Sequence, residues 1–201
     1  MALTVYPGVK ALIFDLDGTL SDSLPVHFTN WNKIGGEMGF VFTERQLYEM
    51  TGSPTIDFAK RIIDENHLQI SPEELVVLKQ EAFRNSIDKI KPIDEVIDVV
   101  RNYYGRLPLS VGTGASRRSA TLQLEALCLA QYFDAVVTAD DVVRHKPYPE
   151  TFLRCAQMMK TAPSDCQVFE DGELGISAAK HAGMCYLDVR FYISSGKWEH
   201  S

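Results

Sequence analysis

The chain has 201 residues, enough for a sizeable core, and its 45% hydrophobic and 23% charged content is ordinary for a globular protein. A net charge of −7 argues against a nucleic-acid surface, which needs clustered cations, although a bound divalent metal would still allow an anionic substrate. No apolar run reaches the roughly 18 residues of a membrane span, and the start does not resemble a secretory signal, so we expect a cytoplasmic protein without membrane or nucleic-acid partners.

The first expected strand, residues 9–14 (VKALIF), runs directly into the sequence DLDGT, which places Asp15 and Asp17 at the end of a buried strand. A hairpin turn would require a second alternating strand after Gly18. An EF-hand loop would require a glycine at its sixth position and a glutamate at its twelfth. The chain provides neither, so local structure does not explain the two carboxylates.

Residues 22 to about 90 show only helical patterns. Two pairs have the capping-box spacing that satisfies free amides at the start of a helix: Thr43 with Gln46, and Ser71 with Glu74. Ser53 and Ser71 each precede a proline, which predicts a helix cap followed by proline in the first turn. These signals indicate an all-helical segment.

The rest of the chain alternates short apolar strands with helical patterns. Four further strands are expected at residues 107–112, 134–138, 166–170 and 184–189. Helices are expected at residues 92–104, 117–129, 149–160 and 173–182, with Gly105 and Gly183 as C-terminal caps. This alternation predicts an α/β fold with a Rossmann-like, doubly wound parallel sheet covered on both faces. We therefore expect a core domain (residues 1–21 and 90–201) and an inserted all-helical cap domain (residues 22–89).

Polar residues follow four of the expected strands, and the carboxyl ends of parallel strands share one edge of a sheet. In chain order they are Asp15, Asp17, Thr113, Gly114, Lys146, Glu170 and Asp171. Each has an ordinary explanation when taken alone, such as a hydroxyl at a strand end or a solvated lysine. Together, the carboxylates would repel one another unless a cation joined them. Mg²⁺ binds carboxylate, water and phosphate oxygens, so the set indicates a magnesium site beside a phosphate.

These residues also resemble a known family. DLDGT, a threonine closing the second strand, Lys-Pro after the third and Glu-Asp after the fourth resemble the four signature motifs of the haloacid dehalogenase superfamily, in the same order. The resemblance covers about residues 9–190. The early helical insertion is similar to the beta-phosphoglucomutase-like subfamily, and VGTG, YFDAVVTADDV and VFEDGELGI resemble bacterial fructose-1-phosphate phosphatases. It implies a Mg²⁺-dependent phosphatase of small sugar phosphates, with fructose 1-phosphate as the leading substrate.

The resemblance implies a role for each matching residue. Asp15 would attack phosphorus and become an aspartyl phosphate, and Asp17 would protonate the leaving oxygen and later accept a proton from water. Thr113 and Gly114 would hold phosphoryl oxygens, and Lys146 would neutralise their charge. The magnesium ligands would be Asp15, the backbone carbonyl of Asp17, Glu170 and Asp171.

Substrate recognition is expected mainly from the cap. His27 and Trp31 lie one turn apart on its first helix and match positions that face the substrate in the subfamily, and Ser23 at the hinge is placed to hydrogen-bond the catalytic acid. The expected substrate contacts are His27, Trp31, Thr51, Gly52, Ser53, Thr55 and Arg117. None of those in the cap carries a fixed positive charge, so a second phosphate would find weak support there.

Two alternatives remain. A sugar phosphomutase of the same subfamily needs a second cationic phosphate site, and the cap loop MTGSPTID lacks the lysine and arginine that such mutases place there; Arg117 and Arg118 keep this reading open. A phospho-accepting signalling receiver is more distant, because receivers carry their nucleophile after the third strand. We further expect a monomer whose partner is a small phosphorylated sugar.

Overall fold

The computed structural model describes residues 3–193, so the outermost ends of the expected core domain, including most of the C-terminal ISSGKWEHS, lie outside the described residues. Five parallel strands form one sheet in the order β3-β2-β1-β4-β5. They are β1 (Ala11–Phe14), β2 (Leu109–Gly112), β3 (Ala135–Val137), β4 (Cys166–Glu170) and β5 (Cys185–Asp188). Each lies within a predicted segment, and the predicted parallel α/β sheet is confirmed.

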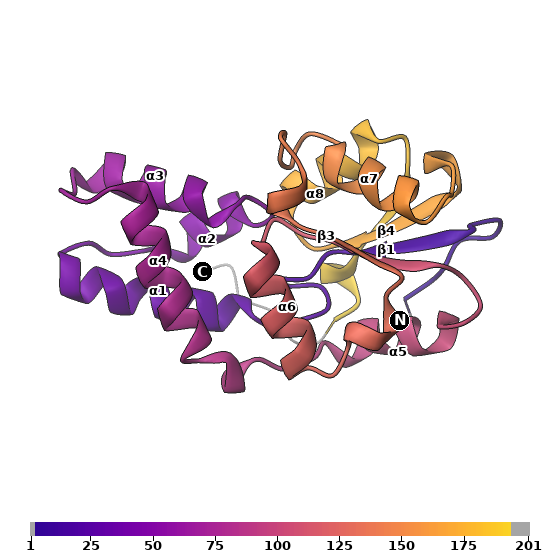
Figure 1. The fold of residues 1–201 in the computed structure, drawn as a ribbon, viewed down its shortest axis with the longest axis horizontal. Coiled ribbons are helices and arrows are strands. Elements are labelled where there is room, and N and C mark those ends of the chain that lie inside the picture. The colour runs from indigo at the N-terminus through magenta and orange to yellow at the C-terminus, as the bar shows by residue number, and fades with distance from the viewer. Residues whose placement is uncertain (1–2, 194–201) are drawn as a thin grey trace.

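Helices cover both faces of the sheet (Figure 1). They are α5 (Asp94–Tyr103), α6 (Arg117–Ala126), α7 (Glu150–Met158) and α8 (Glu173–His181). Side chains alternate along β1, so Leu12 and Phe14 pack with α5 and α6, while Ala11 and Ile13 pack with α7 and α8. All four residues of β1 are fully buried, as a central strand covered on both faces requires.

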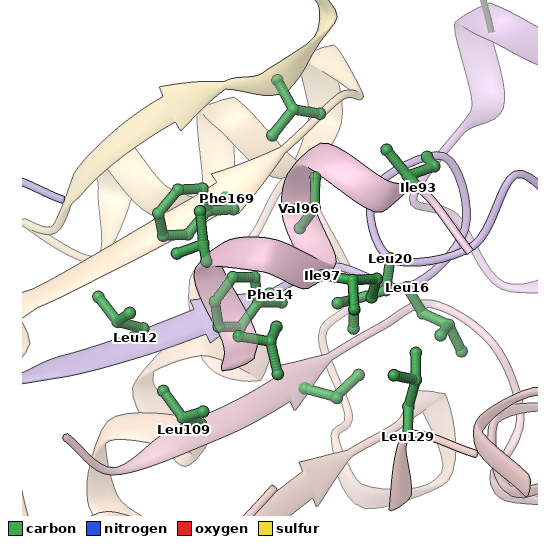
Figure 2. Close-up of a cluster of buried hydrophobic side chains, with 14 of the residues drawn as sticks. Leu12, Phe14, Leu16, Leu20, Ile93, Val96, Ile97, Leu109, Leu129 and Phe169 are labelled. Atoms are coloured by element: carbon green, nitrogen blue, oxygen red, sulfur yellow. The ribbon is translucent and has the colours of Figure 1, made fainter. Parts of the chain in front are cut away.

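An aromatic pair packs between β1 and β4, the two strands with carboxylate residues at their carboxyl ends. Phe14 of β1 stacks on Phe169 of β4, with ring centroids 4.8 Å apart and an interplanar angle of 11°. Val96 and Ile97 of α5 belong to the same apolar cluster (Figure 2). Burial of side chains of this size contributes about 1.5–3 kcal/mol each. The cluster therefore fixes β1 beside β4 immediately before the polar residues at their carboxyl ends.

Four helices and a short 3-10 turn stand between β1 and α5 and are called the inserted helices below. They are α1 (Leu24–Met38), α2 (Glu44–Met50), α3 (Thr55–Asn66), α4 (Pro72–Arg84) and the turn Ile87–Lys89. They lie to one side of the sheet, on the left in Figure 1, and have an apolar cluster of their own that includes Trp31, Phe42 and Phe58. No helix within residues 3–193 has the length and apolar character to cross a membrane.

Both predicted capping boxes are present. The Thr43 hydroxyl accepts a hydrogen bond from the Gln46 amide at 3.2 Å, and the Gln46 side chain accepts one from the Thr43 amide at 2.8 Å. Ser71 and Glu74 repeat the exchange at the start of α4. These bonds satisfy amides that a helix start leaves free, so α2 and α4 begin where the sequence predicts.

The predicted cap at Ser53 is wrong. Helix α3 begins at Thr55 with Pro54 as its N-cap residue and no side-chain cap. Residues 50–53 instead form a tight turn, in which the Ser53 amide donates to the carbonyl of Met50 at 2.9 Å. Gly52, with φ of +95°, supplies the left-handed conformation of this turn, and the turn carries the serine away from the cap position.

The two connections between the sheet and the inserted helices run side by side. The Asp22 amide donates to the Lys91 carbonyl at 2.8 Å, and Ser21 forms an antiparallel bridge with Pro92. The chain therefore leaves the sheet and returns to it at almost one point, close to the hinge positions expected from the sequence. The division into domains at residues 21/22 and 89/90 stays a prediction.

Candidate active site

Residues from four strand ends meet at one edge of the sheet. Asp15 follows β1, Thr113 follows β2, Glu170 ends β4, and Lys146 lies in the loop between β3 and α7. All are buried, with relative exposures of 4% or less. Parallel strands point their carboxyl ends to the same edge, and the order β2-β1-β4 puts these ends next to one another.

Lys146 joins the two carboxylates. Its Nζ donates to Asp15 Oδ1 at 2.6 Å and to Glu170 Oε1 at 2.7 Å, and it lies 4.7 Å from the centre of the Phe152 ring. Burial alone would lower the pKa of Lys146, but the charges of Asp15 and Glu170 outweigh it and raise the pKa. Lys146 is therefore a permanent cation beside Asp15.

Three carboxyl groups form a compact cluster. Oxygen atoms of Asp15, Glu170 and Asp171 lie within 4.8 Å of one another. Burial, followed by the neighbouring Glu170 charge, raises the pKa of Asp171; burial likewise raises that of Asp15 to about 8, although Lys146 opposes the shift. One lysine does not balance three buried carboxylates, and hard oxygen ligands at this spacing fit Mg²⁺. The carboxylate of Asp17 is not part of the cluster, so only its backbone carbonyl remains as the expected ligand.

The turn DLDGT holds one member of this cluster. The Thr19 hydroxyl, fully buried, donates to Asp171 Oδ1 at 2.8 Å. Gly18 has φ of +90° and lies so close to Asp171 that a Cβ at this position would overlap the carboxyl group. The glycine is thus required both by the backbone conformation and by the close approach of the carboxylate.

Asp17 lies beside the cluster and faces a different set of partners. Its Oδ1 accepts hydrogen bonds from Ser23 Oγ at 2.6 Å, Gln123 Nε2 at 2.9 Å and His27 Nε2 at 2.9 Å. Burial raises the pKa of Asp17, but His27, together with the hydrogen bonds from Ser23 and Gln123, lowers it to about 2. The predicted contact between Ser23 and Asp17 is present. The low pKa means that the Asp17 carboxyl group is ionised in the free protein.

His27 connects Asp17 to a buried lysine. Because Nε2 faces a carboxylate, the ring donates there, and Nδ1 accepts from Lys79 Nζ at 2.8 Å. Burial, together with the Lys79 charge, lowers the pKa of His27. Burial lowers the pKa of Lys79 to about 7. Lys79 Nζ also lies 5.5 Å from the Trp31 ring and 5.1 Å from the Phe83 ring.

A cavity that is open to solvent lies between this edge of the sheet and the inserted helices. Its polar and aromatic lining consists of Asp15, Asp17, His27, Trp31, Thr51, Gly52, Ser53, Thr55, Phe58, Lys79, Gln80, Phe83, Thr113, Gly114, Ser119 and Gln123. The cavity therefore brings together six of the seven expected substrate contacts and four of the residues expected to act on the phosphoryl group, Asp15, Asp17, Thr113 and Gly114. Lys146, the fifth, does not line the cavity but contacts Asp15.

Arg117 is the exception among the expected substrate contacts. Its guanidinium group donates to Asp141 and to the Val136 carbonyl, and it is not part of the cavity lining. The acidic side chain after β3 attracts it away from the site, so the structure does not support its expected contact with a substrate. The hydroxyl of Thr51 is also engaged, because it donates to the Leu47 carbonyl at 2.9 Å.

Four polar residues of the cavity were not expected from the sequence: Lys79, Gln80, Ser119 and Gln123. Lys79 places an amine on the cavity wall formed by the inserted helices, whereas none of the expected cap contacts carries a fixed positive charge. A signal for it exists, because Leu75, Lys79 and Phe83 recur every four residues on the buried face of α4. Gln123 likewise stands between buried positions on α6, where a polar residue needs a reason.

The loops on the two sides of the cavity touch through their backbones. A Cβ at Gly114 would overlap the carbonyl oxygen of Gly52, so only glycine permits this approach. Gly52 in turn lies against the side chain of Lys146. The cap loop predicted to contact substrate is thus in direct contact with both expected phosphate-binding elements.

Known proteins resemble this chain in both sequence and fold. Residues 12–189 match the haloacid dehalogenase-like hydrolase family. The chain is 43% identical to fructose-1-phosphate phosphatase YqaB of Escherichia coli over 92% of this chain and 99% of that protein. It is 30% identical to beta-phosphoglucomutase of Bacillus subtilis, over 90% and 83% of the two chains. The crystal structure of beta-phosphoglucomutase from Clostridium difficile has the same fold, with a TM-score of 0.79, 22% identity and coverage of 89% and 83%. The chain is an enzyme of the haloacid dehalogenase-like hydrolase family.

Proposed function

We propose that this enzyme is a Mg²⁺-dependent phosphatase that hydrolyses small sugar phosphates through an aspartyl phosphate on Asp15, with fructose 1-phosphate as the leading substrate. One observation carries the proposal: Asp15, paired with Lys146, borders the same cavity as Asp17, which three hydrogen bonds hold beside it. A nucleophile and an acid–base group are thus placed for the two halves of a hydrolysis.

In the first half, a carboxylate oxygen of Asp15 attacks phosphorus and the bond from phosphorus to the sugar oxygen breaks. The Lys146 ammonium group, already 2.6 Å from Asp15, offsets the negative charge that gathers as a phosphate approaches. Thr113 and the Gly114 amide border the cavity at the end of β2, where they would hold phosphoryl oxygens.

Asp17 would manage the protons. The leaving sugar oxygen takes a proton from Asp17, and in the second half Asp17 takes a proton from the water that attacks the phosphoenzyme and restores Asp15. With a pKa of about 2 in the free protein, Asp17 is already ionised for the second step. A phosphate dianion bound beside it raises the pKa, which favours the protonated form needed in the first step.

Asp15, Glu170 and Asp171, with the Asp17 carbonyl, would hold the magnesium ion. When bound, Mg²⁺ supplies positive charge that stabilises the phosphoryl group during transfer. The fit rests on the chain itself, because three buried carboxyl groups, two of them (Asp15 and Asp171) with raised pKa values, need a cation in order to be ionised together.

The inserted helices would form the cap that selects the sugar. His27, Trp31, Ser53 and Thr55 line the cavity with hydrogen-bonding groups and an aromatic face, which suit a polyol. The substrate named for the Escherichia coli relative, fructose 1-phosphate, supports this as the leading substrate, and the 43% identity extends over nearly the whole chain.

A phosphate-release panel tests the proposal. The enzyme with Mg²⁺ is incubated with fructose 1-phosphate, other hexose and pentose phosphates, and phosphate esters without a sugar. We expect turnover of hexose monophosphates, with fructose 1-phosphate among the best substrates. A protein that releases phosphate from no sugar ester would refute the proposed function.

A phosphomutase is the second candidate, and Lys79 is the observation that favours it. A buried ammonium group near the cavity could support a second phosphate, contrary to the sequence-based expectation. Against it, Lys79 already has His27 and two aromatic rings as partners, and its pKa of about 7 leaves it only partly charged at neutral pH. Incubation with β-glucose 1-phosphate and a bisphosphate primer separates the two: a mutase forms glucose 6-phosphate, whereas a phosphatase releases phosphate.

The remaining expectations are part of the same proposal. The cap comprises residues 22–89, the enzyme is monomeric, and it acts in the cytoplasm. Four free cysteines support a reducing compartment: Cys128, Cys155, Cys166 and Cys185. Sedimentation of the purified enzyme at several concentrations tests the monomer.

A further inference from the structure

Two glutamines among residues 3–193 are completely buried, Gln123 on α6 and Gln167 on β4, and their amides have different partners. The Gln167 side chain donates to the Thr4 carbonyl at 2.9 Å and accepts from the Tyr6 amide at 2.8 Å. Both ends of that amide therefore have partners within the chain. Within the described residues, Gln123 has a partner at one end of its amide only.

The partner of Gln123 fixes which end is free. Its Nε2 donates to Asp17 Oδ1 at 2.9 Å, and a carboxylate oxygen accepts hydrogen bonds, so the amide must present its NH₂ group there. Oε1 is then left as an acceptor. It is buried and accepts no hydrogen bond from any residue in the described range 3–193. An unpaired buried acceptor is costly, and native proteins rarely leave one without a purpose.

The position of Gln123 connects this free acceptor with the reaction. Gln123 lines the cavity together with Asp17, and Ser119, one helical turn earlier on α6, lines it as well. Oε1 belongs to the same amide group as the Nε2 that donates to Asp17 Oδ1 at 2.9 Å, so it lies one amide group and one hydrogen bond away from the carboxylate assigned to the leaving oxygen. A hydroxyl group on a carbon atom close to the phosphoester is the kind of donor from which Gln123 Oε1 would accept a hydrogen bond.

We propose that Gln123 is a specificity-determining residue of the sheet domain, whose Oε1 accepts a hydrogen bond from a hydroxyl group of the leaving alcohol near the phosphoester. This inference rests on the proposed phosphatase function and deepens it. It assigns part of substrate selection to α6, outside the inserted helices. The substrate class is a phosphate ester of a polyol with a hydroxyl near the ester carbon.

Two esters with the same three-carbon chain test the proposal: glycerol 1-phosphate, which carries two hydroxyls, and propyl phosphate, which carries none. The quantity measured is the ratio of their kcat/KM values. For the wild-type enzyme we expect the glycerol ester to be favoured by about 10- to 100-fold, the range expected when a buried acceptor finds or lacks a partner. A ratio near one in the wild-type enzyme would overturn the proposal without any substitution.

Gln123→Met removes the acceptor at nearly constant size and should bring the ratio close to one. Gln123→Asn keeps an amide but is one methylene shorter, so it should lower the ratio too, and it serves if the methionine variant does not fold. Gln167→Met is the matched control, because it removes a buried amide outside the cavity; it should lower the melting temperature and keep the wild-type ratio.

The two esters also separate this proposal from the proposed function. If Gln123 only positions Asp17, its loss slows both esters equally and the ratio stays at the wild-type value, which would contradict hydroxyl recognition. Phosphate release from either ester preserves the phosphatase assignment even where the ratio contradicts the role of Gln123.

Discussion

The two sides of the cavity solve different physical problems. The floor is defined as Asp15, which lines the cavity, and the three residues grouped around it, Lys146, Glu170 and Asp171. It consists of buried charges that contact or adjoin one another directly. The wall, defined as His27, Trp31, Lys79 and Phe83, is aromatic, and its one cation is surrounded by rings. The floor is suited to a metal ion and to the phosphate group, which every substrate of such an enzyme would carry. The wall is suited to the shape of the alcohol, which differs between them.

The floor should be far less tolerant of change than the wall. Asp15→Asn tests its most sensitive point, because an amide of the same size cannot attack phosphorus. We expect phosphatase activity to fall by about 10⁴-fold or more while the fold is retained. Phosphate release and the melting temperature measure the two effects. Asp64→Asn, an exposed position on α3, is the control and should leave activity unchanged. Turnover near the wild-type rate in Asp15→Asn would refute the covalent mechanism.

Asp17→Asn tests the junction of floor and wall, since Asp17 receives donors from both sides of the cavity. The variant keeps the nucleophile but cannot transfer protons, so activity should fall by about 10²–10⁴-fold. Hydrolysis of the phosphoenzyme needs a base, and Asp15 should therefore remain phosphorylated long enough for detection by mass spectrometry. If no phosphoenzyme accumulates and turnover is normal, Asp17 is not the acid–base group.

Mg²⁺ should offset the repulsion between the carboxylates of the floor, and the resulting gain in stability should depend on pH. The raised pKa values of Asp15 and Asp171 mean that the metal-free native state binds more protons than the unfolded state between about pH 4 and 8, so its stability falls as pH rises through that window. Mg²⁺ competes with these protons, and its effect on the melting temperature should be larger near pH 8 than near pH 5.

Asp171→Asn provides the comparison for this measurement, because it removes one proposed ligand and one of the repelling charges. The increase in melting temperature caused by Mg²⁺ should become small at both pH values. Chelation of the metal should also abolish the activity of the wild-type enzyme, and added Mg²⁺ should restore it. Equal stabilisation by Mg²⁺ at both pH values would contradict the assignment of protons to this cluster.

Substitution of Lys79 in the wall should have the smallest effect on activity of the variants considered and should increase the stability of the protein. Lys79 is 4% exposed and its pKa is lowered from 10.5 to about 7, so the native state binds the Lys79 proton less strongly than the unfolded state. The penalty is complete below about pH 7 and disappears towards about pH 10.5. Lys79→Met should therefore stabilise the protein by a few kcal/mol at pH 6 and by less at pH 9.

Thermal unfolding of the wild type and Lys79→Met at the two pH values measures this difference. Lys60→Met is a control at an exposed position of the inserted helices, and it should give no such pH dependence. A gain that is the same at both pH values would show that packing rather than charge burial accounts for it.

The sequence predicts the floor better than the wall for a physical reason. The carboxylates of the floor stand at the ends of β1 and β4, and a parallel sheet brings strand ends together, so Asp15 and Glu170 are neighbours as soon as the strands are recognised. Lys79 and Gln123 acquire their partners only through packing of α4 against α1 and of α6 near the hinge. A local signal was wrong at Ser53, where a turn displaced the helix start. Arg117, expected to contact the substrate, pairs instead with Asp141 in the structure, and its contact with a substrate stays a prediction.

The paired connections at Ser21 and Pro92 have a consequence for how such a protein can be rebuilt. Because the chain leaves the sheet and re-enters it at adjacent residues, everything between them is a single excursion whose length does not affect the strand order. A short turn could join the two ends, and so could a longer or differently shaped insertion. The inserted helices could therefore be replaced by a segment from another protein without altering the registers of β1, β2 and β4 or the charged residues at their ends.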